Sequence, residues 1–302
     1  MKPVRIGTRG SALALWQARA VASLLDAHGR PSEICVIKTD GDRLQDAPLS
    51  DVGGKGLFVK EIEDALLGGA VDLAVHSAKD MSVGLPEGLV VSAVLAREDS
   101  RDALVLRPGQ TALGAAPAIG TGSVRRSAQL RPRYLDARFL PIRGNVDTRL
   151  RQLDAGAFDA LVLAVAGLKR LGYQERVSVG LSHDECVPAP GQGIIALETR
   201  LDNEDIAEVL RAINDVRSTA CFEAERAVVS ALGGGCQLPL GAVAVHLGDR
   251  LDMQAVVASP DGSRHVRGRI EGDASHPAEL GKRLADDLAQ AGAIAILDEV
   301  RY

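Results

Sequence analysis

Aromatic side chains are scarce in this chain. Its 302 residues include one Trp, three Tyr and four Phe, and its formal net charge is −5. Proteins that bind nucleic acid rely on basic surfaces and, for single strands, on aromatic side chains against which the bases stack. The composition therefore disfavours a nucleic-acid-binding protein, and the sequence shows no helix pair typical of DNA binding.

Metal-ligand spacings are missing as well. Cys35, Cys186, Cys221 and Cys236 lie far apart without a Cys-x-x-Cys pair, and the six histidines form no His-Glu-x-x-His motif. Such spacings are typical of structural and catalytic zinc sites. We therefore expect no metal site, no disulfide framework and a reducing, cytoplasmic location.

Long apolar runs are also absent. None approaches the roughly 20 residues that a membrane-spanning helix needs. Residues 1–6 lead directly into a first strand, without the apolar core of a signal peptide. We expect no membrane partner. No sequence feature indicates the oligomeric state, and we expect a monomer.

The chain does have the composition of a folded protein with more than one domain. Hydrophobic residues make up 46% and charged residues 25% of it, which is close to the average of globular proteins. Strands and helices alternate along most of its length, and this predicts an α/β fold. The predicted strands are 4–8, 34–38, 71–76, 89–96, 102–106, 118–120, 139–143, 160–164, 194–199, 243–247, 251–259 and 266–271. The predicted helices are 12–28, 58–67, one capped by Ser123, 146–153, 216–232 and 278–291.

The alternating pattern starts twice, at residue 4 and again at residue 118. The Pro- and Gly-rich stretch 187–193 is typical of a hinge through which the chain returns to its first part. We therefore predict two α/β lobes with a central cleft, on the plan of solute-binding proteins, and a small α+β third domain. The predicted domains are 1–97 with 194–215, 98–193, and 216–302.

One segment is strongly basic. Residues 121–151 contain eight arginines, no lysine and two aspartates, a net charge of +6, so the rest of the chain carries −11. Guanidinium groups pair with carboxylate or phosphate through two parallel hydrogen bonds. The segment therefore predicts an anion that is bound locally.

Two strand-to-helix turns carry arginines that suit such an anion. Arg9 precedes the helix that Ser11 caps, where free backbone N–H groups bind anions, although a solvated surface arginine explains Arg9 equally well. Arg125 and Arg126 lie in the first turn of the helix capped by Ser123, where cations oppose the helix dipole. This pair of cations is stable only beside an anion.

Asp80 and Cys236 are candidate functional residues because of the sequence around them. Asp80 and Lys79 follow the apolar strand 71–76, at the end of a sheet where α/β proteins bind ligands; a surface ion pair is the alternative. Cys236 follows three glycines in the loop 233–241, so its thiol is accessible for covalent attachment. The alternative is a buried structural cysteine.

Six motifs resemble the porphobilinogen deaminase family, in order along nearly the whole chain. They are RGSALALWQA at 9–18, VGGKGLFVKE at 52–61, VHSAKD at 75–80, GTGSVRR at 120–126, RGNV at 143–146 and GGCQ at 234–237. The chain departs from the family at Gly122, where some members carry serine, and at Asp40, in a loop that is often more basic.

The resemblance implies a three-domain transferase of porphyrin and haem biosynthesis, a hydroxymethylbilane synthase. Such an enzyme joins four porphobilinogen molecules head to tail, releases ammonia at each step and frees the linear tetrapyrrole with water. The resemblance also implies a covalent dipyrromethane cofactor, one per chain, which is attached by a thioether to Cys236 and acts as the primer.

By the same resemblance, Asp80 is expected to be the catalytic carboxylate. The residues expected to bind the carboxylates of cofactor and substrate are Arg9, Ser11, Lys55, Lys79, Thr121, Ser123, Arg125, Arg126, Arg143, Arg149 and Gln192. Each pyrrole unit carries two carboxylates, which agrees with the arginine excess. Loss of ammonia leaves a pyrrole cation, which one carboxylate stabilises best where water is excluded, and the same carboxylate can later accept the ring proton.

A non-catalytic binding protein for a small dicarboxylate is the alternative, because it shares the two-lobe plan. Such a protein would have no use for an accessible thiol on a third domain. It would also carry no covalent pyrrole.

Overall fold

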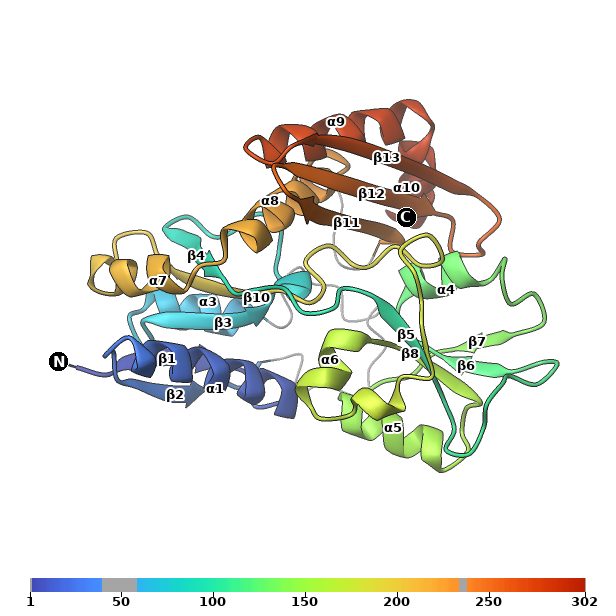
Figure 1. Ribbon diagram of the computed structural model, residues 1–302, viewed down its shortest axis with the longest axis horizontal. Coiled ribbons are helices and arrows are strands. Elements are labelled where there is room, and N and C mark those ends of the chain that lie inside the picture. The colour runs from blue at the N-terminus through green and yellow to red at the C-terminus, as the bar shows by residue number, and fades with distance from the viewer. Residues whose placement is uncertain (1, 40–58, 234–237, 302) are drawn as a thin grey trace. The chain divides into compact units, whose positions relative to one another are not determined.

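The computed structural model describes residues 2–39, 59–233 and 238–301, which belong to two compact units (Figure 1). The first unit combines Met1–Arg97 with Ile194–Thr219, and the second combines Glu98–Gly193 with Ala220–Tyr302. The chain enters the second unit after Arg97, leaves it after Gly193 and enters it again within the helix α8 (Val216–Ala231).

The first unit is built on a five-stranded sheet in the order β2-β1-β3-β10-β4. Its strands are β1 (Val4–Thr8), β2 (Ser32–Val36), β3 (Leu73–Ser77), β4 (Leu89–Val94) and β10 (Ile195–Arg200). β1 runs parallel to β2 and β3, whereas β10 runs antiparallel to both of its neighbours. The strand that returns from the second unit therefore completes this sheet, which confirms the predicted return.

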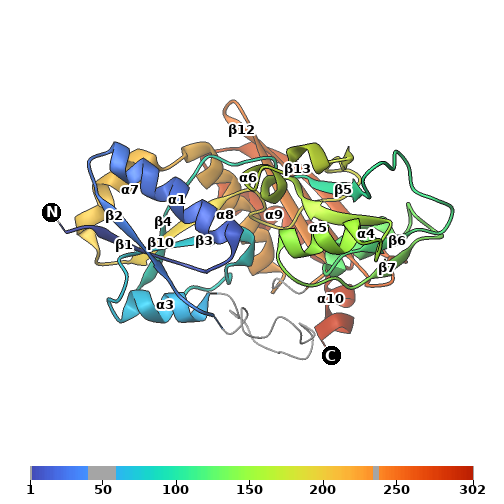
Figure 2. The same ribbon diagram turned by 90° about the horizontal axis from the view of Figure 1, so that it is seen from below.

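Helices cover both faces of this sheet, and Figure 2 shows α1 and α3 on opposite sides of it. The helical elements are α1 (Ala12–Ala27), α3 (Lys60–Leu67), the 3-10 turns η1 (Ala78–Asp80) and η3 (Glu204–Ile206), and α7 (Ala207–Ile213). Leu73 and Val75 of β3 pack in one cluster with α1 and α7, while Ala74 packs in another with α3. The alternation follows from the two-residue period of a strand.

The second unit contains a sheet of the same pattern, in the order β7-β6-β8-β5-β9. Its strands are β5 (Asp102–Leu106), β6 (Ala118–Gly120), β7 (Arg138–Leu140), β8 (Ala160–Ala164) and β9 (Val179–Gly180). β6 runs parallel to β7 and β8, and β5 runs antiparallel to β8 and β9. In both sheets, the strand in fourth place opposes its neighbours and is the first strand after a crossing between the units.

This second sheet is also covered on two faces. Its helical elements are α4 (Val124–Leu130), α5 (Val146–Asp154), α6 (Val165–Arg170) and the 3-10 turn η2 (Gln174–Arg176). Leu130 of α4 belongs to one apolar cluster, and Leu153 of α5 and Leu168 of α6 belong to another. The sequence pattern does not predict α6, because this helix follows β8 without a turn and the two read as one apolar run.

A small antiparallel sheet, β11-β12-β13, follows in the same unit (Figure 1). Its strands are β11 (Leu240–Leu247), β12 (Arg250–Ala258) and β13 (His265–Asp273), and its helices are α9 (Pro277–Gln290) and α10 (Ala293–Arg301). Close backbone approach requires glycine here, because a Cβ at Gly281 would lie 2.1 Å from Ala224 O of α8. The predicted fold class, with two α/β sheets and a small α+β part, is confirmed.

Candidate active site

Asp80 ends the turn η1, which directly follows β3. Ala78 is 5% exposed and Met81 is 4% exposed, so apolar side chains anchor the turn on both sides. The backbone N–H of Ala78 also donates to Ile194 O at 3.0 Å. The side chains of Lys79 and Asp80 remain partly exposed. The end of β3 therefore presents a carboxylate on a backbone that is held in place.

Side chains from three other elements surround the end of β3. His76 Nε2 lies 3.0 Å from Glu198 Oε2 of β10, and both side chains are buried. Gln17 of α1 donates from Nε2 to Ser77 Oγ at 2.9 Å. Burial, followed by the negative charge of Glu198, raises the pKa of Glu63 in α3 to about 7. The sequence analysis missed these partners because they lie far from β3 along the chain.

Arg9 and Ser11 lie in the turn between β1 and α1. Ser11 is the N-cap of α1, and its Oγ accepts from the N–H of Ala14 at 3.3 Å. The predicted cap is confirmed, and Arg9 is partly exposed beside it. A ligand that binds the Ser11 hydroxyl would have to share that oxygen with the helix.

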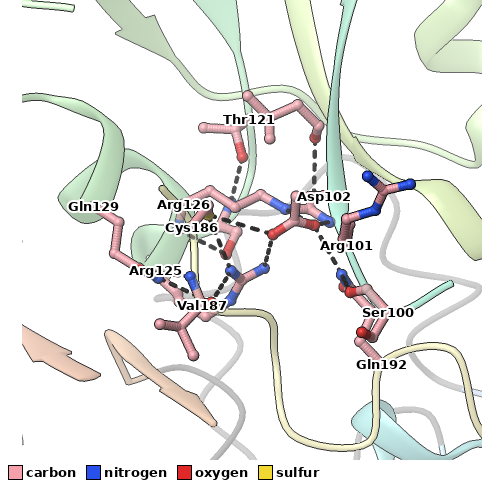
Figure 3. A network of polar contacts seen from close by, with 12 residues as sticks. Ser100, Arg101, Asp102, Thr121, Arg125, Arg126, Gln129, Cys186, Val187 and Gln192 are labelled. Atoms are coloured by element: carbon pink, nitrogen blue, oxygen red, sulfur yellow. Dashed lines mark hydrogen bonds and ion pairs between the residues drawn. The ribbon is translucent and has the colours of Figure 1, made fainter. Parts of the chain in front are cut away.

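In the second unit, Asp102 is the centre of a polar cluster (Figure 3). It is the first residue of β5 and is 0% exposed. Its Oδ2 lies 2.8 Å from Arg125 Nη2, and its Oδ1 accepts from Arg126 Nε at 3.0 Å and Nη2 at 2.7 Å. Gln192 Nε2 donates to the same Oδ1 at 2.9 Å. Burial opposes ionisation of Asp102, but the two guanidinium groups outweigh it and lower the pKa of this carboxyl.

Arg125 and Arg126 are also bound to backbone carbonyls. Arg125 Nη1 donates to Val187 O at 2.7 Å, and Arg126 Nη1 donates to Val162 O at 2.9 Å. Their side chains keep 5% and 8% exposure. The anion that an arginine pair needs at a helix N-terminus is therefore provided by the protein itself. The sequence analysis did not identify Asp102, because β5 precedes α4 by a full strand and loop.

Cys186 completes the cluster around Asp102. Its Sγ lies 3.5 Å from Asp102 Oδ2 and 3.4 Å from Arg125 Nη1. Burial raises the pKa of the Cys186 thiol to about 12, so the thiol stays neutral at neutral pH. Among the residues that the structure describes, the cluster thus holds two cations and one anion.

Thr121 and Ser123 shape the turn that leads into α4. Thr121 Oγ1 accepts from the N–H of Ser123 at 3.2 Å, and Ser123 Oγ accepts from the N–H of Arg126 at 3.4 Å, as the predicted N-cap. Between them, a Cβ at Gly122 would lie 2.9 Å from Ile142 O, so the turn packs closely against the next loop. These contacts fix where the first turn of α4 begins.

Arg143 lies in the loop before α5 and Arg149 in the first turn of α5, and both are partly exposed. Arg149 Nε donates to Gly144 O at 2.7 Å. Gly144 has φ +100°, a conformation that favours glycine. The structure therefore gathers Arg125, Arg126 and Gln192 around Asp102, whereas Arg143 and Arg149 belong to α5 and the loop before it.

Two predicted site residues, Lys55 and Cys236, lie outside the described residues. The elements that flank the loop of Cys236 are joined by Glu225 of α8, which is 0% exposed. Its Oε2 accepts from the N–H of Gly191 at 2.6 Å, and its Oε1 accepts from the N–H of Ala244 in β11 at 2.7 Å. One buried carboxylate thus links the helix before this loop, the strand after it and the segment of Gln192.

Within residues 2–39, 59–233 and 238–301, no group of three or more His, Cys, Asp or Glu side chains could hold a metal ion. No helix there is both long and apolar enough to cross a bilayer.

Two family models match the chain. The model of the porphobilinogen deaminase dipyromethane cofactor binding domain matches residues 4–208, and that of the porphobilinogen deaminase C-terminal domain matches residues 219–290. A curated relative, the porphobilinogen deaminase of Thiobacillus denitrificans, is 47% identical over 309 residues, which cover 99% of this chain and 99% of the relative.

The solved structures that the chain matches are more distant in sequence. The second substrate binding domain of a putative amino acid ABC transporter from Streptococcus pneumoniae has a TM-score of 0.45 and 14% identity, over 77% of this chain and 95% of its own. The BvgS VFT2 domain of Bordetella pertussis has a TM-score of 0.41 and 16% identity, over 68% of this chain and 84% of its own.

Proposed function

The chain belongs to the porphobilinogen deaminase family, and from that premise we propose how its own residues carry out the reaction of the family. It is a transferase of porphyrin biosynthesis, a hydroxymethylbilane synthase. It joins four porphobilinogen molecules in successive steps, with loss of ammonia at each step, and releases the linear tetrapyrrole. Its cofactor, dipyrromethane, supplies when bound the free pyrrole carbon to which the first substrate is joined.

The cationic groups of the second unit fit a cofactor that carries four carboxylates. Arg125 and Arg126 share one internal anion, Asp102, so the cluster keeps a charge of +1 among the described residues. Carboxylates bind guanidinium groups through charge-assisted hydrogen bonds about twice as strong as neutral ones. This arginine cluster is the observation that carries the residue assignments.

We assign the covalent attachment to Cys236, by a thioether, and the domain that presents it to residues 216–302. The first lobe then comprises 1–97 with 194–215, and the second comprises 98–193. The carboxylates of cofactor and substrate would be held by Arg9, Ser11, Lys55, Lys79, Thr121, Ser123, Arg125, Arg126, Arg143, Arg149 and Gln192.

Asp80 is the proposed catalytic carboxylate. Its turn is anchored through the backbone, and the carboxylate can accept a hydrogen bond from a pyrrole N–H of the substrate. As ammonia leaves, positive charge develops on that pyrrole, and the carboxylate stabilises it. After the new carbon–carbon bond has formed, the same carboxylate can accept the proton that the ring loses.

We also propose that the chain acts as a monomer in the cytoplasm. Among the described residues, Cys35 and Cys186 are free thiols, which supports a reducing compartment. Gel filtration coupled to light scattering tests the monomer, and a mass near twice 31.7 kDa would contradict it.

An intact-protein mass measurement tests the proposed function directly. The purified chain should exceed its sequence mass by two linked pyrrole units and should release hydroxymethylbilane from porphobilinogen. A bare chain that binds a dicarboxylate without turnover would favour the alternative of a non-catalytic binding protein. That alternative is not favoured now, since the family matches span both the cofactor-binding and the C-terminal domain.

A further inference from the structure

We propose that Asp102 is a positioning residue for the carboxylate-binding site. It orients Arg125 and Arg126 and cancels one of their two charges, so that the pair is ready to bind a single carboxylate of the cofactor or of the growing chain. This inference rests on the proposed function, since it explains how the two arginines would perform the role assigned to them.

The two oxygens of Asp102 hold the guanidinium groups separately. Oδ2 faces Arg125, and Oδ1 faces Nε and Nη2 of Arg126 (Figure 3). Each guanidinium is fixed from a second direction by a backbone carbonyl, Val187 O for Arg125 and Val162 O for Arg126. Contacts from two directions fix the plane of a guanidinium group, which decides whether two parallel hydrogen bonds to a ligand can form.

Both guanidinium groups keep hydrogen-bonding capacity. An arginine has five N–H donors. Arg125 uses Nη1 toward Cys186 and Val187 and Nη2 toward Asp102. Arg126 uses Nε and Nη2 toward Asp102 and Nη1 toward Val162. Within the described part of the chain, three donors of each group are therefore engaged and two remain for a ligand.

The charge of the cluster fits one carboxylate. The described contacts include no second carboxylate on either arginine, and the Cys186 thiol is neutral. An unpaired positive charge in a largely buried place raises the free energy of the protein, and a bound anion removes this cost. Without Asp102 the two guanidinium groups would repel each other at short range, and their fixed orientation would be lost.

Asp102 also connects the cluster to the segments where the chain crosses between the units. β5 begins at Asp102, soon after the crossing that follows Arg97. Gln192, next to the return crossing after Gly193, donates from Nε2 both to Asp102 Oδ1 and to Ser100 O, the latter at 2.7 Å. The orientation of the arginines is thus set by residues of both crossing segments.

The test is Asp102→Asn in the full chain, with kcat and KM for porphobilinogen measured beside the intact mass. The asparagine keeps the shape but loses the charge. We expect KM to rise at least about tenfold, the effect of misaligning a charge-assisted hydrogen bond, while kcat changes less. A folded variant that lacks the added mass of two pyrroles supports the proposal too, since primer assembly needs the same arginines.

Asp159→Asn is the matched control. Asp159 also pairs with an arginine, Arg107, and accepts from the N–H of Ala118, but it lies outside the cluster. It should lower thermal stability and leave KM unchanged. The same outcome for Asp102→Asn, lower stability with unchanged KM, would reduce Asp102 to a structural role and overturn the proposal.

Gln192→Glu keeps the proposal testable if Asp102→Asn does not fold. A second carboxylate beside Asp102 would make the cluster neutral, so KM should rise about tenfold as the attraction for a substrate carboxylate falls. An unchanged KM contradicts the proposed charge balance. A wild-type chain without bound pyrrole or turnover would instead refute the proposed function, and the two failures can be told apart.

Discussion

The carboxylate of Asp80 owes its position to neighbours that are not themselves reactive. Ala78 and Met81 are buried on either side of it, and His76 is paired with Glu198 just before it. Because this backbone is held in place, it cannot shift to compensate for a longer side chain at position 80. The distance between its oxygens and a bound pyrrole should therefore be critical.

Asp80→Glu tests this requirement. The longer side chain keeps the charge but displaces it by one methylene, so we expect kcat to fall by about 100-fold, a typical cost of misplacing a catalytic group by about 1 Å. The cofactor should remain attached, as seen in the intact mass. Turnover close to that of the wild type would contradict the assignment of Asp80.

Glu63 gives a second prediction at the scale of a residue. Its pKa is raised to about 7, so the folded protein holds the proton more tightly than the unfolded chain does. The contribution of Glu63 to stability is therefore complete at low pH and is lost as the pH rises from about 4.5 toward and through 7. Glu63→Gln should remove this loss.

The measurement is the thermal midpoint at several pH values between about 5 and 8, where the amide side chain of the variant cannot titrate. The variant should gain a few degrees relative to the wild type at the upper end of this range, and little at the lower end. A constant difference between the two proteins across the range would show that Glu63 does not titrate there.

At the scale of elements, glycines allow α9 to approach both α8 and β13 closely. Gly281 allows α9 to pack against Ala224 O of α8. In β13, a Cβ added at Gly272 would lie 2.5 Å from Leu280 Cδ1 of α9. Helix and sheet therefore approach more closely than a side chain at either position would allow. The resulting packing fixes α8, which carries Glu225.

Gly281→Ala should consequently destabilise the protein by about 1–3 kcal/mol, the usual cost of overpacking a core. Gly114→Ala is the control, because no atom of the described residues other than its chain neighbours lies within 4 Å of a Cβ at this position, and it should be neutral or slightly stabilising. Urea unfolding curves measure both changes. Equal midpoints for the two variants would show that α9 can shift at little cost.

At the scale of the whole molecule, each unit has hydrophobic cores among the residues that the structure describes. The apolar clusters of the two five-stranded sheets consist of residues between 4 and 210, and the small sheet packs on α9. We therefore expect Cys236→Ala to fold as a chain without the mass of two pyrrole units. Circular dichroism and intact mass check this, and a two-pyrrole adduct on that variant would rule out Cys236 as the tether.

Local patterns were sufficient for most elements of the fold. The caps at Ser11 and Ser123, the strand that ends before Asp80 and the return of the chain to its first sheet all follow from short-range signals such as capping residues and apolar periodicity. The helix α6 does not follow from such signals, because Val165 continues the apolar run of β8. The partners of the site residues could not be predicted either.

Periodicity, composition and motifs were sufficient to predict the α/β class, the basic segment between residues 121 and 151 and the family. The contacts of Asp102 with Arg125, Arg126 and Gln192 become visible in three dimensions alone, as does the link that Glu225 makes between α8, β11 and the segment before Ile194. The physical reason is that a buried charge must find its partners in space. Strand pairing across the sheets, rather than spacing along the chain, brings those partners together.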